Sequence, residues 1–480
     1  MLPVKEEIEN LFRQHSNAAI YTIEKIPQSG SDRIYFRITT DNGNCIATFN
    51  RNVKENNTFL NFSRHFKKQQ CPVPDIYAVN EDQTIYIQQD FGDISLLNKL
   101  EEFGPTEYVF KLFKKSLKAL AHLQIKGDEG LNYKWCITSK KFGKQAIISD
   151  LLYFKYYFLD TLKIPYDKEK LIDDFEVLGT YLGRADYQYF MFRDFQSRNI
   201  MVKGEEVFFI DYQGGMKGAL QYDVASLLWQ AKANLSDDWK NSLLDYYISC
   251  IEEILQEPID RIRFIGQYNG YVLIRLLQVL GAYGFRGLFE RKAHFLTSIP
   301  LALRNIQWFI HNKHVGISVP EFERLLGLMT EEEVIHRFEN IKATEETPLV
   351  VTINSFSYKK GIPADPSDNG GGFIFDMRGI LNPGRIDEYK TQSGLDKPVK
   401  DFLEQQTKMP QFLNSVYNII DISVEDYILR GFDKLMINFG CTGGQHRSVY
   451  AAEAIARHLR NKFRVKTIIT HTNKENWKTL

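Results

Sequence analysis

The spacing of apolar and polar positions divides the chain into parts with different predicted structure. Before about residue 100, short apolar runs are separated by turns such as SGSDR (29–33) and DNGN (41–44), which predicts strands. The run 55–70 has helical spacing and ends before two prolines. From about 105 to 310 helical spacing dominates. We therefore expect a small strand-rich lobe followed by a helical lobe.

A segment with a different pattern, FRDFQSRNIMVKGEEVFFIDYQGG (192–215), interrupts the helical part. Two apolar bursts flank a turn at Gly204, which predicts a short hairpin. Asp194 and Asn199 precede the hairpin, and Asp211 closes its second strand. Taken singly, such residues often cap turns. Together they supply the oxygen ligands and the base that a Mg²⁺–phosphate site requires.

The order of these residues matches the catalytic loop of kinases. In this interpretation Asp194 is the catalytic base, and Asn199 and Asp211 hold Mg²⁺ against the phosphates of ATP. Phe192 stands where most kinases have a histidine that supports the loop. Tyr212-Gln213 replaces Phe-Gly after the second aspartate, which argues against a protein-kinase switch and favours a small-molecule kinase.

Three further stretches agree with this interpretation: SGSDRIYFR (29–37), QQDFGDISL (88–96) and RLLQVLGAYGFRGLFERKAHFLTSIPLALRN (275–305). With them, residues of about 15–310 resemble the aminoglycoside-phosphotransferase-like superfamily, most closely its N-acetylmuramate/N-acetylglucosamine anomeric kinases. The resemblance implies an α+β bilobal protein-kinase-like (aminoglycoside phosphotransferase) domain over residues 1–310. Its small lobe would cover about 1–100 and its helical lobe about 101–310. It also implies ATP- and Mg²⁺-dependent phosphorylation of a sugar.

The small lobe is expected to hold the nucleotide. A strand–turn–strand can offer backbone and hydroxyl donors to phosphates, and the hinge of such a fold would contact adenine through its backbone. The expected nucleotide-binding residues are Ser29, Gly30, Ser31, Asp32 and Arg33 in the turn, and Gln89, Asp90 and Phe91 in the hinge.

One feature of the small lobe departs from the kinase pattern. The strand CIATFN (45–50) lacks the lysine that kinases normally carry there. Arg33, Arg37 or Arg51 is a candidate to neutralise the phosphates instead. Glu55 opens the helix that usually supplies an acidic partner, although a solvated glutamate fits equally well. Outside this lobe, Asp223 is expected to brace the catalytic loop.

The pattern changes again near residue 350. Residues 311–348 read as a helical linker in which Thr330 is expected to cap a helix. Beyond it, short apolar bursts (LVVTINSF, GFIFDMRG, LMINFG) alternate with helices such as SVYAAEAIARHLRNK. This alternation predicts a separate α/β domain over residues 349–480.

A loop in this domain, GCTGGQHRSVY, follows an apolar strand and opens a helix. Five residues separate Cys441 from Arg447, the spacing of cysteine phosphatases, in which a thiolate and an arginine meet one phosphate. Gly443 and Gly444 allow the backbone to approach an anion closely. A tight turn with a buried cysteine is the plainer alternative. We favour an anion-binding loop without thiol catalysis, because no general acid is identifiable.

The loop also carries a resemblance, together with NSFSYKKGIPADPSDNGGGFIFDMRGILNPG (354–384) and SGLDKPV (393–399). These residues resemble the C-terminal domain of RapZ, an RNase adapter that senses glucosamine-6-phosphate and binds small RNA. RapZ carries a Walker loop in its N-terminal domain, whereas this chain has no GxxxxGK[ST]. The resemblance implies an anion or phosphosugar site lined by Lys359, Asp376, Arg378, Thr442, Gly443, Gly444, His446 and Arg447. Turn glycines and surface ion pairs are the alternative interpretation of the same residues.

Composition and charge limit the partners and the compartment. Lys and Arg number 60, as do Asp and Glu, which implies neither nucleic acid nor membrane as a partner. The basic end of the chain, with eight Lys/Arg and two Glu from residue 447 onward, fits an RNA-facing patch or a solvated helix. Five cysteines without paired spacing indicate reduced thiols. The apolar run 271–285 is shorter than a membrane span, and MLPVKEEIEN lacks a signal-peptide core. We expect a cytoplasmic protein.

Together these features predict a cytoplasmic, ATP- and Mg²⁺-dependent kinase that phosphorylates the anomeric hydroxyl of an amino sugar. A phosphosugar would bind its C-terminal domain. One alternative keeps the chemistry but changes the acceptor to another hydroxylated small molecule. A second is an RNA-binding adapter in which the kinase fold is a nucleotide-gated scaffold, and the intact metal-binding residues weigh against it.

Overall fold

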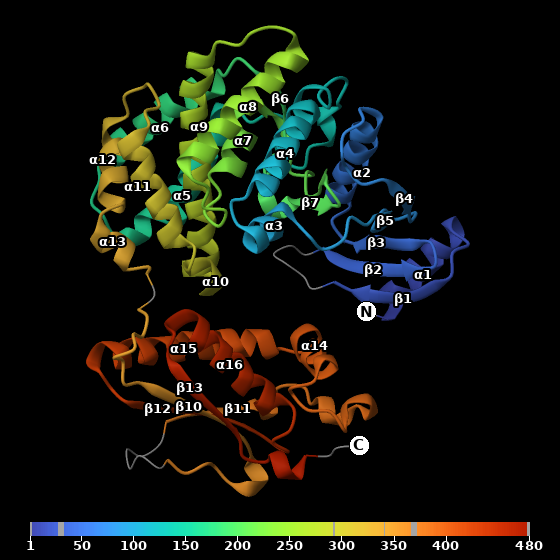
Figure 1. Cartoon of the computed structure of the whole chain (residues 1–480), viewed down its shortest axis with the longest axis vertical. Helices are drawn as coiled ribbons and strands as arrows, with labels where there is room; N and C mark the ends of the chain where they lie inside the picture. The colour runs from blue at the N-terminus through green and yellow to red at the C-terminus, as the bar shows by residue number, and fades with distance from the viewer. Residues whose placement is uncertain (1, 27–32, 291–292, 340, 366–371, 478–480) are drawn as a thin grey trace. The chain divides into compact units, whose positions relative to one another are not determined.

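The computed structural model describes residues 2–26, 33–290, 293–339, 341–365 and 372–477 (Figure 1). The chain divides into two compact units. Residues 1–282 and 301–334 form the first unit, and residues 283–300 and 335–480 form the second. The two predicted lobes of the kinase-like domain lie almost entirely in the first unit, and the predicted α/β domain lies in the second.

A five-stranded antiparallel sheet forms the small lobe, in the order β1-β2-β3-β5-β4. Its elements are α1 (Leu2–His15), β1 (Ile20–Lys25), β2 (Ile34–Thr40), β3 (Gly43–Phe49), α2 (Val53–Lys68), β4 (Ile76–Val79) and β5 (Ile85–Gln89). Alternate residues of β2, Phe36 and Ile38, point into one core and are fully buried. Ile8 and Leu11 of α1 belong to the same core. The strand-rich lobe and its helix α2 confirm the sequence-based expectation.

Helices dominate the rest of the first unit. They are α3 (Leu96–Phe103), α4 (Glu107–Ile125), α5 (Lys144–Tyr157), α6 (Lys168–Gly183), α7 (Gln221–Leu228), α8 (Asp237–Leu255), α9 (Arg261–Tyr283), α11 (Ile299–Asn312), α12 (Pro320–Met329) and α13 (Glu332–His336). The interrupting segment forms two small antiparallel sheets, β6 (Gln188–Met191) with β9 (Met216–Ala219) and β7 (Ile200–Lys203) with β8 (Glu206–Phe209). The predicted hairpin is therefore present, and Gly204 takes the left-handed conformation at its turn (φ +64°).

The region predicted as a linker belongs in large part to the first unit. Helix α12 packs on α6, where the rings of Phe322 and Phe175 meet edge to face with centroids 5.2 Å apart. The Asp174 carboxylate accepts the N–H of Phe322 at 2.8 Å and so satisfies a donor in the first turn of α12. Thr330 was expected to begin a helix, but it follows the end of α12 and is buried. Residues 301–334 therefore group with the first unit.

Helix α9 continues through a π-helical turn, Gly284–Phe289, and is longer than the apolar run suggested. Over Arg261–Phe289 it is long and apolar enough to cross a membrane by length and composition, and 56% of its most apolar window is buried inside the structure. A core helix of a soluble protein has the same properties. Tyr271 and Arg275 of α9 are both buried within the first unit.

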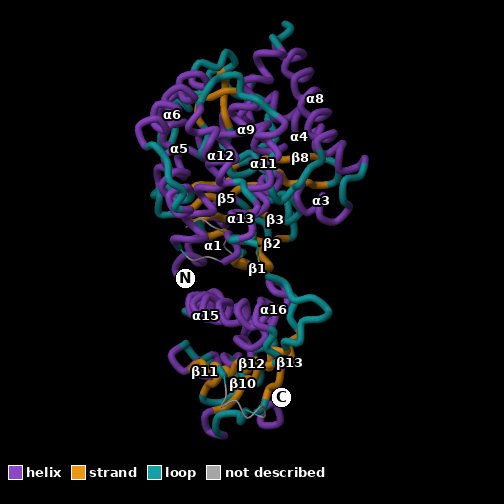
Figure 2. The backbone as a smooth tube through the Cα atoms, turned by 90° about the vertical axis from the view of Figure 1, so that its left-hand side faces the viewer, coloured by secondary structure: helices purple, strands orange, loops and turns teal. Residues whose placement is uncertain are grey.

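The second unit is built on a parallel sheet in the order β11-β12-β10-β13. Its elements are α10 (Ala293–Leu296), β10 (Val350–Ser357), β11 (Phe373–Asp376), α14 (Lys397–Gln406), α15 (Met409–Arg430), β12 (Lys434–Cys441), α16 (Arg447–Phe463) and β13 (Lys466–His471). Figure 2 shows α15 and α16 on the same side of this sheet. Parallel strands end at one edge, so the loops after β10, β11 and β12 lie at the edge where α/β sheets bind ligands. The predicted α/β domain is confirmed.

Candidate functional site

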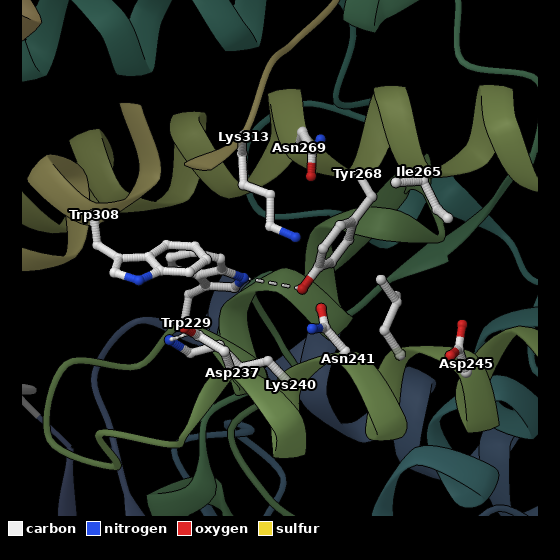
Figure 3. Close-up of a pocket in the computed structure, with 11 residues that line it drawn as sticks. Trp229, Asp237, Lys240, Asn241, Asp245, Ile265, Tyr268, Asn269, Trp308 and Lys313 are labelled. Carbon is white, nitrogen blue, oxygen red and sulfur yellow. Dashed lines mark hydrogen bonds and ion pairs between the residues drawn. The ribbon is translucent and has the colours of Figure 1, made fainter. Parts of the chain in front are cut away.

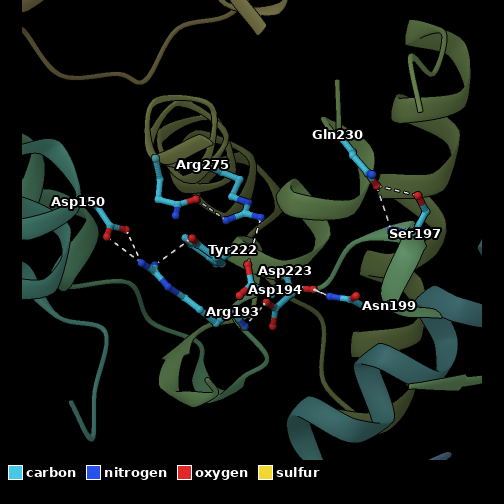
Figure 4. Close-up of polar contacts among 10 residues, drawn as sticks. Asp150, Arg193, Asp194, Ser197, Asn199, Tyr222, Asp223, Gln230 and Arg275 are labelled. Atoms are coloured by element: carbon cyan, nitrogen blue, oxygen red, sulfur yellow. Dashed lines mark hydrogen bonds and ion pairs between the residues drawn. The ribbon is translucent and has the colours of Figure 1, made fainter. Parts of the chain in front are cut away.

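The catalytic-loop motif folds into a tight arrangement at the base of the β7–β8 hairpin (Figure 4). Asn199 immediately precedes β7, and the N–H of Ile210, just after β8, donates to the Asn199 carbonyl at 3.1 Å. This backbone bond brings Asn199 next to Asp211. The Asn199 side-chain amide donates to the backbone carbonyl of Asp194 at 2.9 Å. The three residues predicted for base and metal thus meet in one place.

Asp194 presents its carboxylate to solvent. Its side chain is 46% exposed, which leaves it accessible to a substrate hydroxyl. A guanidinium nitrogen of Arg275 lies 3.4 Å from the carboxylate. Arg275 itself is buried in α9, so it places a fixed positive charge behind the exposed acid. The sequence had shown Arg275 only as a charge within an apolar run.

Asp223 holds the catalytic loop by hydrogen bonds to its backbone, as predicted. Its carboxylate accepts the backbone N–H groups of Phe192 at 2.7 Å and Arg193 at 2.9 Å, and the amide of Gln124 at 2.9 Å. Burial raises the pKa of the Asp223 carboxyl to about 7, although these three donors favour the ionised form. A buried acceptor with three donors fixes the loop immediately before Asp194.

The buried Asp223 makes stability depend on pH. Its pKa is about 7 in the fold and near 3.8 when unfolded, so between these values the folded state holds the extra proton. The free energy of unfolding therefore falls as pH rises through this window. Asp223→Asn removes that dependence, and its stability relative to wild type is expected to rise by roughly 4 kcal/mol from pH 4 to pH 7.5. Urea unfolding at several pH values measures this, and a constant difference between the two proteins contradicts it.

Arg193 is a structural neighbour of the base. Its backbone is left-handed (φ +79°), which is uncommon for a residue other than glycine. Both carboxylate oxygens of Asp150 accept from its guanidinium at 2.7 Å, and the Tyr222 hydroxyl accepts at 2.9 Å. The guanidinium also lies 4.6 Å from the centre of the Phe142 ring. These contacts stabilise a strained backbone directly before Asp194.

Asp211 is the second residue of the site with a left-handed backbone (φ +73°). Arg33 donates to its carboxylate at 2.6 Å, and Gln213 donates at 2.8 Å. Burial acts to raise the pKa of the Asp211 carboxyl, but the charge of Arg33 and these hydrogen bonds hold it below its usual value. Asp211 is therefore a carboxylate near neutral pH, as a metal ligand must be. Gln213 replaces the glycine of kinases and orients this carboxylate.

Arg33, just before β2, places a positive charge beside Asp211 although β3 lacks the lysine. It is buried, lies 3.4 Å from Glu55 on α2 and contacts Asp211 as well. Arg37 instead pairs with Asp90 and Asp93, each at 2.7 Å, at the hinge. Arg51, the third candidate, is exposed, and Arg33 is the one that pairs with the predicted metal ligand Asp211.

The structure describes the predicted hinge but only Arg33 of the predicted nucleotide-binding turn. Ser29, Gly30, Ser31 and Asp32 lie outside the described residues. In the hinge, the Gln89 N–H already donates to the carbonyl of Asp75 at 2.9 Å. Phe91 is buried and stacks on Phe208 with centroids 4.2 Å apart, so its side chain packs rather than faces a ligand. Adenine binding by this hinge stays a prediction.

One support of the catalytic loop had no signal in the sequence. Gln230, just beyond α7, accepts both the backbone N–H of Ser197 at 3.0 Å and its hydroxyl at 2.7 Å. Ser197 lies between Asp194 and Asn199, so Gln230 fixes the middle of the loop. Gln230 and Asp150 are far from the motif in sequence, and no local spacing links them to it.

The C-terminal loop forms a compact turn between β12 and α16. Cys441 is buried, and its sulfur accepts the N–H of Gly444 at 3.1 Å and lies 3.2 Å from the Ser448 hydroxyl. Gly444 is left-handed (φ +62°), and a Cβ there would meet backbone atoms of β10. Asn473 donates to the Gly443 carbonyl at 2.7 Å. The loop is rigid, and its cysteine is packed.

Arg447 hydrogen-bonds to the protein backbone instead of presenting its whole guanidinium to an anion. One terminal nitrogen donates to the carbonyls of Ile380 at 2.8 Å and Arg378 at 3.2 Å. Its Nε is buried and has no hydrogen-bond partner among the described residues. Burial lowers the pKa of the Arg447 guanidinium. His446 donates to the Tyr389 carbonyl at 2.9 Å and packs in the turn, and burial lowers its pKa.

The remaining predicted C-terminal residues lie on the surface near this loop. Asp376, at the end of β11, pairs with Arg378 at 2.6 Å. The Arg378 guanidinium lies 4.1 Å from the centre of the Tyr358 ring, and Lys359 follows that tyrosine after β10. Thr442 is exposed, and its carbonyl accepts from Ser357 at 2.8 Å. The structure thus gathers these residues at one sheet edge, with Asp376 and Arg378 already paired.

Two family models match separate parts of the chain. The model described as phosphotransferase enzyme family matches residues 22–257. The model described as RapZ C-terminal domain matches residues 349–475. Each match lies within one of the two compact units. The fold is therefore a protein-kinase-like domain followed by a parallel-sheet α/β domain.

Curated relatives match part of the chain. A nucleotide-binding protein of Fervidobacterium nodosum is 36% identical over 249 residues, which cover 47% of this chain and 85% of that protein. A nucleotide-binding protein of Clostridium acetobutylicum is 40% identical over 116 residues. That match covers 24% of this chain and 38% of the relative, so the chain spans well under half of that protein's length.

Solved structures match part of the chain at low identity. Amicoumacin kinase hAmiN, solved with AMP-PNP, Ca²⁺ and Ami, is 10% identical with a TM-score of 0.46, and the match covers 67% of this chain and 99% of that one. Choline kinase of Cryptosporidium parvum is 13% identical with a TM-score of 0.45, and the match also covers 67% and 99%.

Proposed function

Because this chain belongs to the same family as the nucleotide-binding protein of Fervidobacterium nodosum, and joins a RapZ C-terminal domain to one of the phosphotransferase enzyme family, we propose that it is a cytoplasmic ATP-dependent sugar kinase. One observation carries the proposal. An exposed carboxylate, Asp194, stands beside Asn199 and Asp211 on a loop that buried groups hold rigidly.

The residues of the site divide the work of phosphoryl transfer. Asp194 orients the acceptor hydroxyl and takes its proton as the new bond to phosphorus forms. The buried guanidinium of Arg275 lies 3.4 Å from the Asp194 carboxylate and helps to orient it. Arg33 faces the Asp211 side of the site and neutralises phosphate charge there. The rigid loop keeps these groups in place, which is the main means of catalysis in this class of reaction.

The site fits a magnesium–nucleotide complex. Asn199 and Asp211 offer hard oxygen ligands, and Asp211 is held ionised. Among the described residues no group of three or more His, Cys, Asp or Glu forms a metal cluster. Magnesium commonly takes one or two protein ligands and completes its shell with phosphates and water. When bound, the ion neutralises charge on the transferring phosphoryl group.

The proposed acceptor is an amino sugar of the N-acetylmuramate or N-acetylglucosamine type, phosphorylated at its anomeric hydroxyl. The stretches that resemble such kinases support it. A panel of free sugars, amino alcohols and aminoglycosides incubated with Mg·ATP tests it. ADP release that requires N-acetylmuramate or N-acetylglucosamine supports the assignment. Turnover confined to amino alcohols or aminoglycosides supports kinase activity but contradicts a sugar acceptor.

We also propose that the C-terminal loop binds the phosphate of a phosphosugar. The buried Nε of Arg447 has no hydrogen-bond partner among the residues that the structure describes and lies beside a glycine turn at a helix N-terminus, which supports this proposal. Arg447→Ala is expected to lose about 1.5–3 kcal/mol of binding, roughly 10- to 150-fold in affinity. Cys441→Ser keeps an acceptor for the Gly444 N–H and should change affinity little. Calorimetric titration of glucosamine-6-phosphate into the full chain measures both.

The control for these variants is thermal unfolding without ligand. Arg447 also donates to two backbone carbonyls, so its loss is expected to lower the melting temperature. Binding is therefore compared at a temperature at which each variant is folded. Unchanged affinity in Arg447→Ala removes the anion loop, and phosphate release that depends on Cys441 points to a phosphatase.

A further inference from the structure

A cavity of about 200 Å³ lies in the helical lobe, among α8, α9 and the end of α11 (Figure 3). It is lined by Trp229, Asp237, Lys240, Asn241, Leu244, Asp245, Ile265, Tyr268, Asn269, Trp308 and Lys313. One water needs about 10–15 Å³, so this is no packing defect. The catalytic residues Asp194, Asn199 and Asp211 are not part of the lining. The cavity has room for a small molecule.

Two lysines give one end of the cavity a positive charge. Lys240 is largely buried and pairs with Asp237 at 3.4 Å. Lys313 has no carboxylate within ion-pair distance among the described residues, and Figure 3 shows its ammonium group directed into the cavity. Burial lowers the pKa of Lys240, and the like charge of Lys313 lowers it further. In the part of the chain that the structure describes, the Lys313 charge thus has no carboxylate partner, and Asp245 stands at the opposite end of the lining.

An aromatic wall adjoins these charges. The rings of Trp229 and Trp308 lie with centroids 5.5 Å apart, and Trp308 is only half-buried. The ammonium of Lys240 lies 4.3 Å from the centre of the Trp229 ring, and that of Lys313 lies 5.9 Å from the Trp308 ring. A flat apolar group can pack on Trp308 while an attached anion reaches Lys313. Most ligand sites combine apolar walls and a few polar groups in this way.

The wall connects to the catalytic loop through adjacent residues. The Trp229 indole donates to the Tyr268 hydroxyl at 3.0 Å inside the cavity. The next residue, Gln230, accepts both hydrogen bonds of Ser197 in the catalytic loop. A ligand that packs against Trp229 therefore contacts the residue next to Gln230, which holds Ser197 in place.

We propose that this cavity binds a small molecule with an anionic group and a flat apolar face, and that its occupancy is transmitted to the catalytic loop through Trp229, Gln230 and Ser197. The anionic group is a phosphate or a carboxylate, since either pairs with an ammonium. The second half of the proposal rests on the proposed kinase function, because only then does the loop carry chemistry. The binding itself does not.

Calorimetric titration of the full chain with phenyl phosphate, phenylacetate and phenol tests the binding. At least one of the two anions should bind, while phenol, which has the same ring without the charge, should bind at least tenfold more weakly. Lys313→Gln should weaken anion binding at least tenfold. Lys232→Gln, which changes an exposed lysine of the same lobe outside the cavity, should leave it unchanged. Anion binding no tighter than that of phenol, or unaffected by Lys313→Gln, overturns the site.

Hydrogen exchange of residues 193–200 tests the transmission. Saturation with the bound anion should change the exchange rates of these amides in wild type, and should leave them unchanged in Lys313→Gln. If the anion binds without changing hydrogen exchange at residues 193–200, the binding site stands and the proposed coupling to the catalytic loop is wrong. Both measurements are made without ATP or acceptor, so their outcome is separate from that of the kinase assay.

Discussion

Asp194→Asn is expected to lower the rate of phosphoryl transfer by about 10²- to 10⁴-fold, the usual contribution of a positioned base. The amide has nearly the shape of the carboxylate but takes no proton. Asn199 and Asp211 remain in place, so Mg·ATP affinity should stay within about twofold. Single-turnover transfer and nucleotide titration separate the two effects.

The matched control is Asp173→Asn, on the exposed side of α6, which should leave both quantities unchanged. Turnover in Asp194→Asn close to that of wild type rules Asp194 out as the base. Loss of nucleotide binding together with turnover would instead show that the substitution disturbs the loop.

Asp211→Ala is expected to weaken Mg²⁺-dependent nucleotide binding by at least about tenfold, or about 1.4 kcal/mol. The substitution removes a metal ligand and also leaves Arg33 without one of its acidic partners. Nucleotide affinity measured with Mg²⁺ and with EDTA tests this. The expected loss appears in the presence of the ion.

Arg33→Gln separates the two contributions of that substitution. It keeps Asp211 but removes its cationic partner, so nucleotide affinity should fall both with and without Mg²⁺. Asp82→Asn, in the exposed β4–β5 turn, is the control. If Asp211→Ala lowers affinity equally with and without the ion, Asp211 is not a metal ligand.

The part of the site that the sequence predicted is the part that is local in sequence. Asp194 and Asn199 precede one hairpin and Asp211 follows it, so the pairing of its two strands brings them together. Arg33 reaches Asp211 across 178 residues, and Arg275 reaches Asp194 across 81. No periodicity records such contacts, since they depend on how the lobes pack.

In the C-terminal loop, too, the sequence predicted the local elements but not the contacts with distant segments. The spacing of Cys441 and Arg447 predicted a strand, a tight turn and a helix, which are all present. It did not predict that Arg447 would turn toward the carbonyls of residues 378 and 380, because that direction depends on a distant segment. The packing of α12 was unpredictable for a related reason, because Phe322 packs on a helix about 150 residues earlier in the chain.

The central claim is that the first unit transfers the γ-phosphoryl group of ATP to a sugar through Asp194. Phosphorus NMR of the full chain with Mg·ATP and N-acetylmuramate or N-acetylglucosamine tests it most directly, with Asp194→Asn in parallel. We expect a new sugar-phosphate resonance that appears with ADP in wild type and is absent in the variant over the same time. ATP that stays intact with both sugars, or an equal product signal in Asp194→Asn, would contradict the claim.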